Sequence, residues 1–475
     1  MTQRGSHQLR IPACDLSCNE PEIVVCLRLY VVMKCAQRHA CAAAPPEEAT
    51  RNERCSGRSM FDSMKLNSLL ASCVPGRPLP QAFYKDEDLF AADMALIWER
   101  HWLFAGLSCE IKRAGDWFTL NVGESSIVVV RDRDGTIRAF FNTCRHRGSR
   151  ICAGERGSSR VLSCPYHQWT YGLDGKLVFA GNMGESFDVS QHGLKPVACE
   201  SVAGYIFINL AREPQDFTSF SQRVTPYLAP HGIDNAKVAF ESTIVEKGNW
   251  KLVIENNREC YHCTANHPEL LRTISEYDGP TDPRYGSEGA VFAAKTARDE
   301  ARWAAGGLPY APVEEAPEYR LIRAAMERGL SFTMTGEPAC RRVMGTLPEQ
   351  DVGSLRLLRF PNTWNHALGD HAIAFRLLPL GPRETQVTTK WLVHEDAVEG
   401  VDYDLETLTA VWNATNAQDQ RLVETNQLGI NSVGYEPGEY SSLVESGVIA
   451  FIDWYLGSMR DGLVRSSPTL PVRAA

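Results

Sequence analysis

The chain has 475 residues, of which 44% are hydrophobic and 23% are charged. This composition excludes disordered and fibrous proteins, and the length is sufficient for two or three domains with cores of their own. The formal net charge is −9, and Lys and Arg are scattered rather than clustered, so the sequence gives no indication of a nucleic-acid partner.

Residues 1–63 differ in composition from the rest of the chain. Their apolar run, residues 23–33, is only 11 residues long and is interrupted by Arg28, so it fits neither a signal peptide nor a membrane span. We interpret this segment as a disordered or mis-started extension, with the working protein beginning near Met60 or Met64; a disulfide framework is the alternative. Because the apolar run is neither a signal peptide nor a membrane span, we expect a cytoplasmic protein. Six cysteines fall in the segment: Cys14, Cys18, Cys26, Cys35, Cys41 and Cys55.

The next part of the chain begins with a helix and continues in strands. Apolar residues recur at helical spacing from Asp86 to Trp102, behind an Asp suited to cap a helix. The dipeptides Asp134-Gly135 and Asp174-Gly175 are hairpin-turn signals. We therefore predict a small all-β domain over residues 103–212. Its strands are expected at residues 117–122, 126–132, 137–142 and 205–210.

The remaining chain, residues 213–475, predicts a second domain of different architecture. Helices are expected at 249–263 and 402–427, and strands at 354–360, 371–380 and 385–394. Because strands and helices do not alternate as βαβ units, we expect an α+β fold with an antiparallel sheet flanked by helices. Residues 64–102 are expected to pack on this domain.

The all-β segment contains a pair of mixed Cys and His motifs. Cys144 and His146 form one motif, Cys164 and His167 form the other, and 17 residues separate His146 from Cys164. A Rieske 2Fe-2S cluster takes two Cys on one iron and two His on the other, which two facing hairpin tips would provide. Tetrahedral zinc is the alternative, although zinc modules usually pair Cys with Cys and His with His. The motifs therefore predict a Rieske cluster.

A second group of ligand-type residues lies in the α+β segment. Glu259, His262 and His267 follow one another closely, and a break between Cys263 and Pro268 is expected to let the two imidazoles converge. An iron that activates O2 normally takes two His and one carboxylate. Asp419 lies on the apolar stripe of the late helix and is the predicted third ligand. The alternatives for that carboxylate are Asp396 and Asp402.

From about residue 83 to residue 448 the chain resembles a known family. The sequences that carry the likeness are CRHRGS, CPYHQWTYGLDG, ENNRECYHCTANHPEL, WLVHEDAVEGVDYD and ATNAQDQRLVETNQLGINS. They resemble alpha subunits of Rieske non-haem iron oxygenases, in the quaternary-ammonium branch that includes glycine betaine and proline betaine (stachydrine) demethylases. The likeness implies a Rieske domain at 103–212 and a mononuclear-iron catalytic domain of helix-grip type at 213–475.

The resemblance also implies an activity and partners. It implies an O2-dependent monooxygenase that N-demethylates glycine betaine to dimethylglycine and formaldehyde, with electrons from NAD(P)H delivered by a separate flavin and ferredoxin-type reductase. It implies a homotrimer in which Glu259 links the partner subunit's His167 to His262, with Glu255 as the alternative bridge. The other functions considered are a stachydrine or carnitine-type substrate, an aromatic-ring dioxygenase and a Rieske electron carrier.

A quaternary ammonium group has no N–H to donate, so its pocket should offer aromatic faces. The candidates are Phe332 and Trp364, followed by Tyr435 and Trp454, and ordinary core packing is the alternative for each. The substrate carboxylate also needs a donor, for which the sequence indicates no unique residue.

Overall fold

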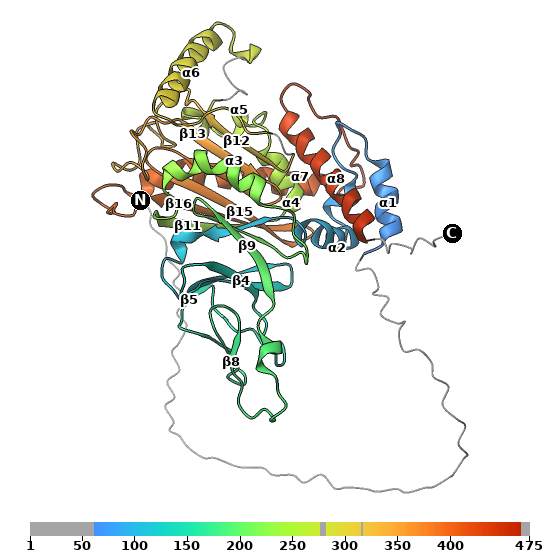
Figure 1. Cartoon of the computed structure of the whole chain (residues 1–475). Coiled ribbons are helices and arrows are strands. Elements are labelled where there is room, and N and C mark those ends of the chain that lie inside the picture. Colours follow the sequence, from blue (N-terminus) through green and yellow to red (C-terminus); the bar gives the residue numbers. More distant parts are fainter. Residues whose placement is uncertain (1–60, 276–281, 315–316, 467–475) are drawn as a thin grey trace, which may run out of the picture. The chain divides into compact units, whose positions relative to one another are not determined.

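The computed structural model describes residues 61–275, 282–314 and 317–466 (Figure 1). The predictions made for residues 1–60 lie outside this described part. The first described helix, α1 (Ser63–Ser72), is capped by the Asp62 carboxylate, which accepts hydrogen bonds from two backbone N–H groups of its first turn. None of the described helices combines the length and the low polarity that a membrane-spanning segment requires.

The predicted all-β segment forms a seven-stranded antiparallel sheet and a small three-stranded sheet (Figure 1). Gly135 and Gly175 adopt positive φ angles of 85° and 82° at the two expected hairpin turns, and the four predicted strands are confirmed. The large sheet has the order β1 (Leu103–Leu107), β10 (Tyr205–Asn209), β9 (Pro196–Val202), β4 (Ile137–Phe141), β3 (Ser125–Arg131), β2 (Asp116–Val122) and β5 (Arg156–Ser158). The small sheet contains β6 (Leu162–Ser163), β7 (Thr170–Tyr171) and β8 (Leu177–Phe179).

The second sheet has six strands, and every pair in it is antiparallel, as the α+β prediction requires. The three strands expected from alternation are present as β13, β15 and β16. Three others were missed, because polar residues interrupt their apolar pattern: β11 mixes polar residues on both faces, β12 buries Arg323, and β14 contains Asn365 and His366. The order is β11 (Lys237–Glu246), β16 (Glu384–Val393), β15 (Ala372–Gly381), β14 (Thr363–Ala367), β13 (Ser354–Arg359) and β12 (Tyr319–Ala324).

Helices pack around the six-stranded sheet, and three of them pack together near the candidate site. The long helix α7 (Leu405–Ile430) contacts β11 and the shorter α4 (Trp250–Asn257), and α8 (Ser446–Ser466) also packs on α4. The first predicted helix is present as α2 (Glu87–Asp93) behind its Asp86 cap, and it continues into a wider helical turn, Met94–Trp98. The other helices are α3 (Thr218–Leu228), α5 (Cys263–Asn266) and α6 (Ser287–Ala305).

A buried ion pair anchors α4, the helix that leads into the site. Lys251 of α4 and Asp93 of α2 have no exposed side-chain surface and form an ion pair. Asp93 also accepts hydrogen bonds from Trp250 Nε1 at 2.9 Å and from the Tyr455 hydroxyl at 2.6 Å. A buried ion pair of this kind is tolerated only when its remaining hydrogen-bonding capacity is satisfied. This network ties α2, α4 and α8 together.

The predicted helix over residues 249–263 is wrong in its second half. The helix α4 ends at Asn257, and the chain becomes helical again only in the single turn of α5. The reason is local: the Glu259 carboxylate accepts hydrogen bonds from the backbone N–H groups of Tyr261 and His262, which competes with helical hydrogen bonding. The helix therefore breaks once before His262, and the expected break between Cys263 and Pro268 is present as well, because α5 ends at Asn266.

Candidate metal centres

The two Cys and His motifs of the all-β domain form loops with the same backbone design. In the first, the Gly148 N–H donates to the Cys144 carbonyl at 2.9 Å, and in the second the Gln168 N–H donates to the Cys164 carbonyl at 3.0 Å. Gly148 and Gln168 both adopt positive φ angles, of 80° and 59°. Each loop therefore turns back at the fourth residue after its cysteine.

The side chains of the two loops are arranged as a cluster requires. Cys144 and Cys164 are buried, whereas His167 is exposed and His146 partly so. The ring centroids of the two histidines lie 4.6 Å apart. The Nδ1 atom of His146 is buried and has no hydrogen-bond partner in the described structure. Two inner sulfurs and two outer imidazoles fit a Rieske 2Fe-2S cluster, in which one iron takes Cys and the other takes His.

The surroundings of Cys164 favour a thiolate. Burial opposes ionisation of this thiol, but hydrogen bonds from the Tyr166 backbone N–H, from Cys144 and from the His167 backbone N–H outweigh it, and the pKa falls below its ordinary value. The Tyr171 hydroxyl lies 3.3 Å from Cys144 Sγ. Hydrogen bonds to cluster sulfurs are among the features that set the potential of such centres. Cys109 and Cys152 are buried thiols outside these loops.

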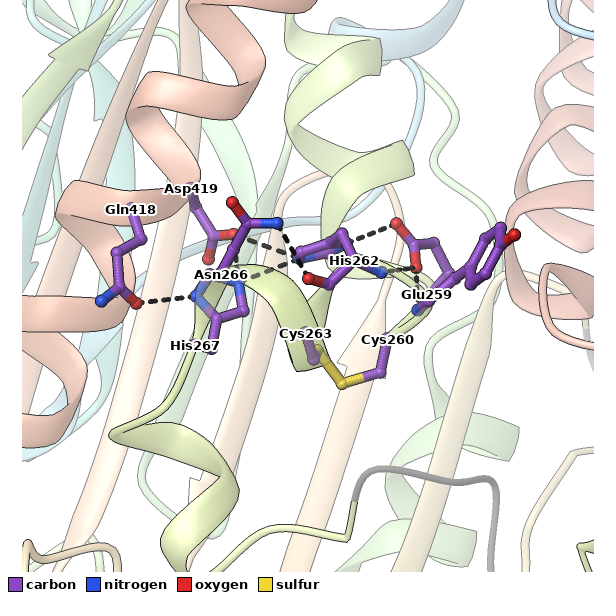
Figure 2. The surroundings of a disulfide bond; sticks show 9 residues. Glu259, Cys260, His262, Cys263, Asn266, His267, Gln418 and Asp419 are labelled. Carbon is purple, nitrogen blue, oxygen red and sulfur yellow. Dashed lines mark hydrogen bonds and ion pairs between the residues drawn. A yellow bond between two sulfur atoms is a disulfide. The ribbon is translucent and has the colours of Figure 1, made fainter. Parts of the chain in front are cut away.

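The second group meets where α5 faces the middle of α7 (Figure 2). The Nε2 atoms of His262 and His267 lie 3.0 Å apart. Asp419 Oδ1 lies 3.4 Å from His262 Nε2 and 3.0 Å from His267 Nε2. Three donor atoms at such separations match neighbouring positions around an ion that each approaches at about 2.1 Å, with other positions left open. The two imidazoles and the carboxylate therefore fit a mononuclear iron.

The electrostatics of this group favour a bound cation. Burial lowers the pKa of His262, but Asp419 and Glu259 more than offset it and raise the pKa to about 9. Burial raises the pKa of Asp419, but hydrogen bonding to the two imidazoles keeps the net shift downward. Apart from the two imidazoles, the buried Asp419 Oδ1 atom has no polar contact in the described structure. A positive charge is stabilised between these groups, whether a proton or a metal ion supplies it.

Glu259 contacts the far side of the same imidazole. Its Oε1 atom lies 2.5 Å from His262 Nδ1 (Figure 2), and its side chain is only 13% exposed. Glu255, the alternative for the bridging role, accepts hydrogen bonds from the Tyr84 and Tyr440 hydroxyls, both at 2.9 Å. Of the two carboxylates, Glu259 is therefore the one that hydrogen-bonds His262.

Gln418 takes part in the site, although the sequence analysis did not select it. Its Oε1 atom lies 2.8 Å from His267 Nδ1 (Figure 2). Its amide nitrogen donates to the Glu269 carboxylate at 2.8 Å. A partner on the second ring nitrogen fixes which nitrogen faces a metal. Its position next to the predicted ligand Asp419 was the only signal in the sequence.

A disulfide encloses the loop that carries His262. Cys260 and Cys263 are bonded, with Cα atoms 4.9 Å apart (Figure 2). Cys263 lies close to both imidazoles, but a disulfide sulfur is not a thiolate and does not compete with Asp419 as a ligand. The two alternative carboxylates lie elsewhere: Asp402 is hydrogen-bonded by Arg342, and Asp396 lies beside His394.

An aromatic cluster lies on the same face of α7 as Asp419. Trp412 is seven residues before Asp419, and its ring centroid lies 5.0 Å from those of His366 and Phe375 and 6.0 Å from that of Phe332. Trp364 stacks on Phe375 at 5.1 Å and lies directly opposite it in the β14–β15 pair. The other two candidates lie elsewhere. Tyr435 donates to the Leu79 carbonyl, and Trp454 packs on Phe360 and Phe451.

Comparison with family models assigns both domains. The Rieske [2Fe-2S] domain model matches residues 101–191, and the model for the catalytic domain of ring-hydroxylating alpha subunits matches residues 233–461. The chain belongs to the ring-hydroxylating alpha-subunit family of Rieske oxygenases. It is therefore an oxidoreductase whose cofactors are a Rieske 2Fe-2S cluster and a mononuclear iron.

Particular relatives narrow the class further. The chain is 52% identical to the glycine betaine monooxygenase oxygenase subunit of Chromohalobacter salexigens, over 83% of this chain and 88% of that one. It is 49% identical to the protein of the same name from Pseudomonas aeruginosa, over 82% and 90%. A carnitine monooxygenase oxygenase subunit from Escherichia coli is 35% identical over 41% of this chain and 54% of its own. These relatives confirm the expected quaternary-ammonium branch.

Solved structures share the fold. A quaternary ammonium Rieske monooxygenase in complex with L-carnitine matches with a TM-score of 0.62 at 22% identity, over 82% of this chain and 98% of that one. Naphthalene 1,2-dioxygenase from Rhodococcus sp. matches with a TM-score of 0.60 at 18% identity, over 85% and 100%. The α+β prediction with a Rieske domain is confirmed.

Proposed function

We propose that this chain is the oxygenase component of a monooxygenase that N-demethylates glycine betaine to dimethylglycine and formaldehyde. The observation that carries the proposal is the 52% identity to a glycine betaine monooxygenase oxygenase subunit over 88% of that relative. The pairing of Glu259 with His262 beside Asp419 supports it, since the residues needed for the chemistry converge in this chain.

The residue roles follow from the two centres. Cys144, His146, Cys164 and His167 would hold the Rieske cluster, in a domain that we assign to residues 103–212. The mononuclear iron would be held by His262, His267 and Asp419, in a catalytic domain that we assign to residues 213–475. When bound, it supplies the O2 chemistry that hydroxylates an N-methyl group. We assign residues 64–102 to packing on the catalytic domain and residues 1–63 to an N-terminal extension.

The protein's contribution to the reaction is orientation and exclusion of water. Glu259 holds the ring of His262 through its Nδ1 atom, and Gln418 holds that of His267 in the same way. The aromatic faces around Trp412 would hold the trimethylammonium group, because a fixed cation is attracted to aromatic rings once water is removed. The methyl groups would then face the open positions beside Asp419.

Electrons would reach the site from outside the chain. We propose a separate NAD(P)H-dependent flavin and ferredoxin-type reductase, which places the reaction in the cytoplasm, and a homotrimer in which the partner subunit's His167 hydrogen-bonds Glu259. A cavity of about 340 Å³ supports this arrangement, because Glu259 and His262 line it together with Tyr84 and Tyr440. The carboxylate that contacts His262 is thus accessible from the side away from Asp419.

Formaldehyde release tests the function. Iron-loaded oxygenase with a surrogate reductase and NADH is expected to release one formaldehyde per glycine betaine consumed. Stachydrine, carnitine and choline complete the substrate panel, and an aromatic substrate assayed for cis-diol tests the dioxygenase alternative. Formaldehyde from none of the quaternary ammonium compounds would contradict the proposal.

A further inference from the structure

Arg356 carries a positive charge for which the described structure supplies no partner. It lies on β13, its side chain is only partly exposed, and its Nε atom is buried without a hydrogen-bond acceptor. Burial, with the positive charge of Arg320, lowers its pKa to about 10, so the guanidinium remains charged at neutral pH. A charge withdrawn from water without a counter-charge is costly, and such a group is normally paired.

Three other arginines of this sheet make side-chain contacts that Arg356 lacks, although Nε and Nη1 of Arg359 and Nε of Arg376 are also buried without a hydrogen-bond partner. Arg323 donates to the carbonyls of Pro309 and Val352, and Arg376 donates to that of Ala105. Arg359 lies over the ring of Phe220, 4.1 Å from its centroid. The Arg356 side chain has no hydrogen bond or ion pair to any residue of the described ranges, so its charge is open to a ligand in this part of the chain.

The register of the sheet places Arg356 beside the aromatic cluster. Arg356 and His366 are directly opposite in the β13–β14 pair, so their side chains share one face of the sheet. His366 contacts Trp412, Phe332 and Phe375, with ring centroids 5.0, 5.4 and 6.2 Å apart. Arg356 therefore lies on the α7 side of the sheet, the side of Asp419.

The aromatic cluster beside Arg356 contains further buried polar atoms without hydrogen-bond partners. His366 Nδ1 is buried and has no hydrogen-bond partner, and the same is true of Trp412 Nε1. Burial and the neighbouring Arg356 hold the pKa of His366 well below its ordinary value, so the ring is neutral and carries one N–H. A guanidinium and an imidazole N–H are both donors, so the neighbouring Arg356 and His366 together offer an anion site.

We propose that Arg356, assisted by His366, binds the carboxylate of the zwitterionic substrate while its quaternary ammonium group lies against Phe332, Phe375 and Trp412. The inference rests on the proposed function and deepens it, because it makes a short betaine the preferred substrate class over an amine without a carboxylate. The guanidinium supplies charge-assisted hydrogen bonds to the carboxylate, and the substrate supplies the counter-charge that Arg356 lacks.

The test compares the Arg356→Met variant with wild type by calorimetric titration of iron-loaded oxygenase with glycine betaine in the absence of O2. Affinity is expected to fall roughly 10- to 100-fold, the usual effect of losing hydrogen bonds to a charged group. Arg356→Lys should recover part of it. The matched control is Arg320→Met, on the neighbouring strand, where the arginine is exposed and paired with Glu314.

Thermal unfolding without substrate separates binding from structure. Because Arg356→Met removes an unpaired charge, the melting temperature of the substrate-free protein is expected to stay the same or rise. Unchanged glycine betaine affinity in Arg356→Met would overturn the inference, as would an affinity loss that Lys does not reverse and that accompanies a lower melting temperature. Formaldehyde release by the wild-type protein tests the proposed function separately. The demethylase function and the carboxylate-binding role of Arg356 can therefore fail independently.

Discussion

Gln418 Oε1 lies 2.8 Å from Nδ1 of His267, the ring whose Nε2 faces Asp419 at 3.0 Å. Adjacent residues of one helix thus contact opposite nitrogens of one imidazole (Figure 2). The arrangement requires His267 Nδ1 to carry the proton, because an amide oxygen only accepts. Nε2 is then free to bind a metal.

Replacing Gln418 by Leu should weaken iron retention. Without an acceptor on Nδ1, the His267 ring loses its fixed orientation, and loss of such a partner typically lowers metal affinity about 10- to 100-fold. The measurement is iron content after dialysis against a graded chelator. Gln420→Leu is the matched control, since Gln420 is on the same helix but donates to the Val245 carbonyl. Equal iron retention in the two variants would refute the role.

Asp419→Ala should remove one iron and leave the cluster. Loss of the carboxylate leaves two imidazole ligands, and the iron count is expected to fall from about three per chain to about two, with the Rieske absorption spectrum unchanged. Asp402→Ala is the control and should retain all three irons, because Asp402 pairs with Arg342. A variant at Asp419 that keeps full iron and activity would exclude this carboxylate as a ligand.

Glu259→Gln should slow turnover without removing either cofactor. Glutamine keeps the size of the side chain but loses the charge that faces His262 Nδ1, and a 10- to 100-fold fall in kcat is expected for a group of this kind. Single-turnover reoxidation of the cluster should slow in parallel. Glu255→Gln tests the alternative bridge, and a larger loss there than at Glu259 would reverse the assignment.

Mixed oligomers test electron transfer between subunits. Cys164→Ala should lack the cluster and Asp419→Ala the mononuclear iron, so each is expected to be inactive alone. Co-expressed in equal amounts, they should recover about a quarter of wild-type activity, since about one in four head-to-tail contacts of a random trimer joins an intact cluster to an intact iron. Transfer within one chain predicts no recovery.

The buried Glu255 should make stability depend on pH. Burial raises its pKa to about 7, and hydrogen bonds from Tyr440 and Tyr84 and the charge of Lys251 only partly oppose this, while Glu445 adds to it. The folded state therefore holds this proton more tightly than the unfolded chain. The resulting stability is complete below about pH 4 and is lost as the pH rises to about 7.

Glu255→Gln should remove this dependence. Between pH 5 and pH 8 the free energy of unfolding of the variant is expected to rise relative to wild type by up to about 3 kcal/mol, since one pKa unit corresponds to about 1.4 kcal/mol. Urea unfolding across this range measures it. Glu439→Gln, at an exposed ion pair with Arg77, is the control, and identical pH profiles for all three proteins would contradict the assignment.

The sequence predicted the parts of the site that are defined by ligand chemistry. Asp419 was selected because a carboxylate on an apolar stripe is unusual, and the structure brings it beside His262 and His267. Their role as ligands stays a prediction that metal analysis tests. The local backbone was not predictable in the same way, because the Glu259 carboxylate competes for backbone N–H groups and ends α4 early.

Residues whose importance depends on strand register could not be identified from the sequence. Arg356 is one arginine among many until β13 and β14 pair and place it opposite His366. The strand β14 itself was not predicted, so the aromatic cluster could not be assembled from Phe332 and Trp364 alone. Long-range pairing carries this information, and no local pattern contains it.

The helix α7 carries both Trp412 and Asp419, so the distance between these two residues along the helix axis is fixed. Seven helical residues advance about 10.5 Å along the axis, and an uninterrupted helix does not stretch. The distance along the helix axis from Trp412 to the Asp419 carboxylate is thus set by a single rigid helix. Bending or stretching of α7 cannot adjust where a bound quaternary ammonium group lies relative to Asp419, so only the side chains around the helix can change it.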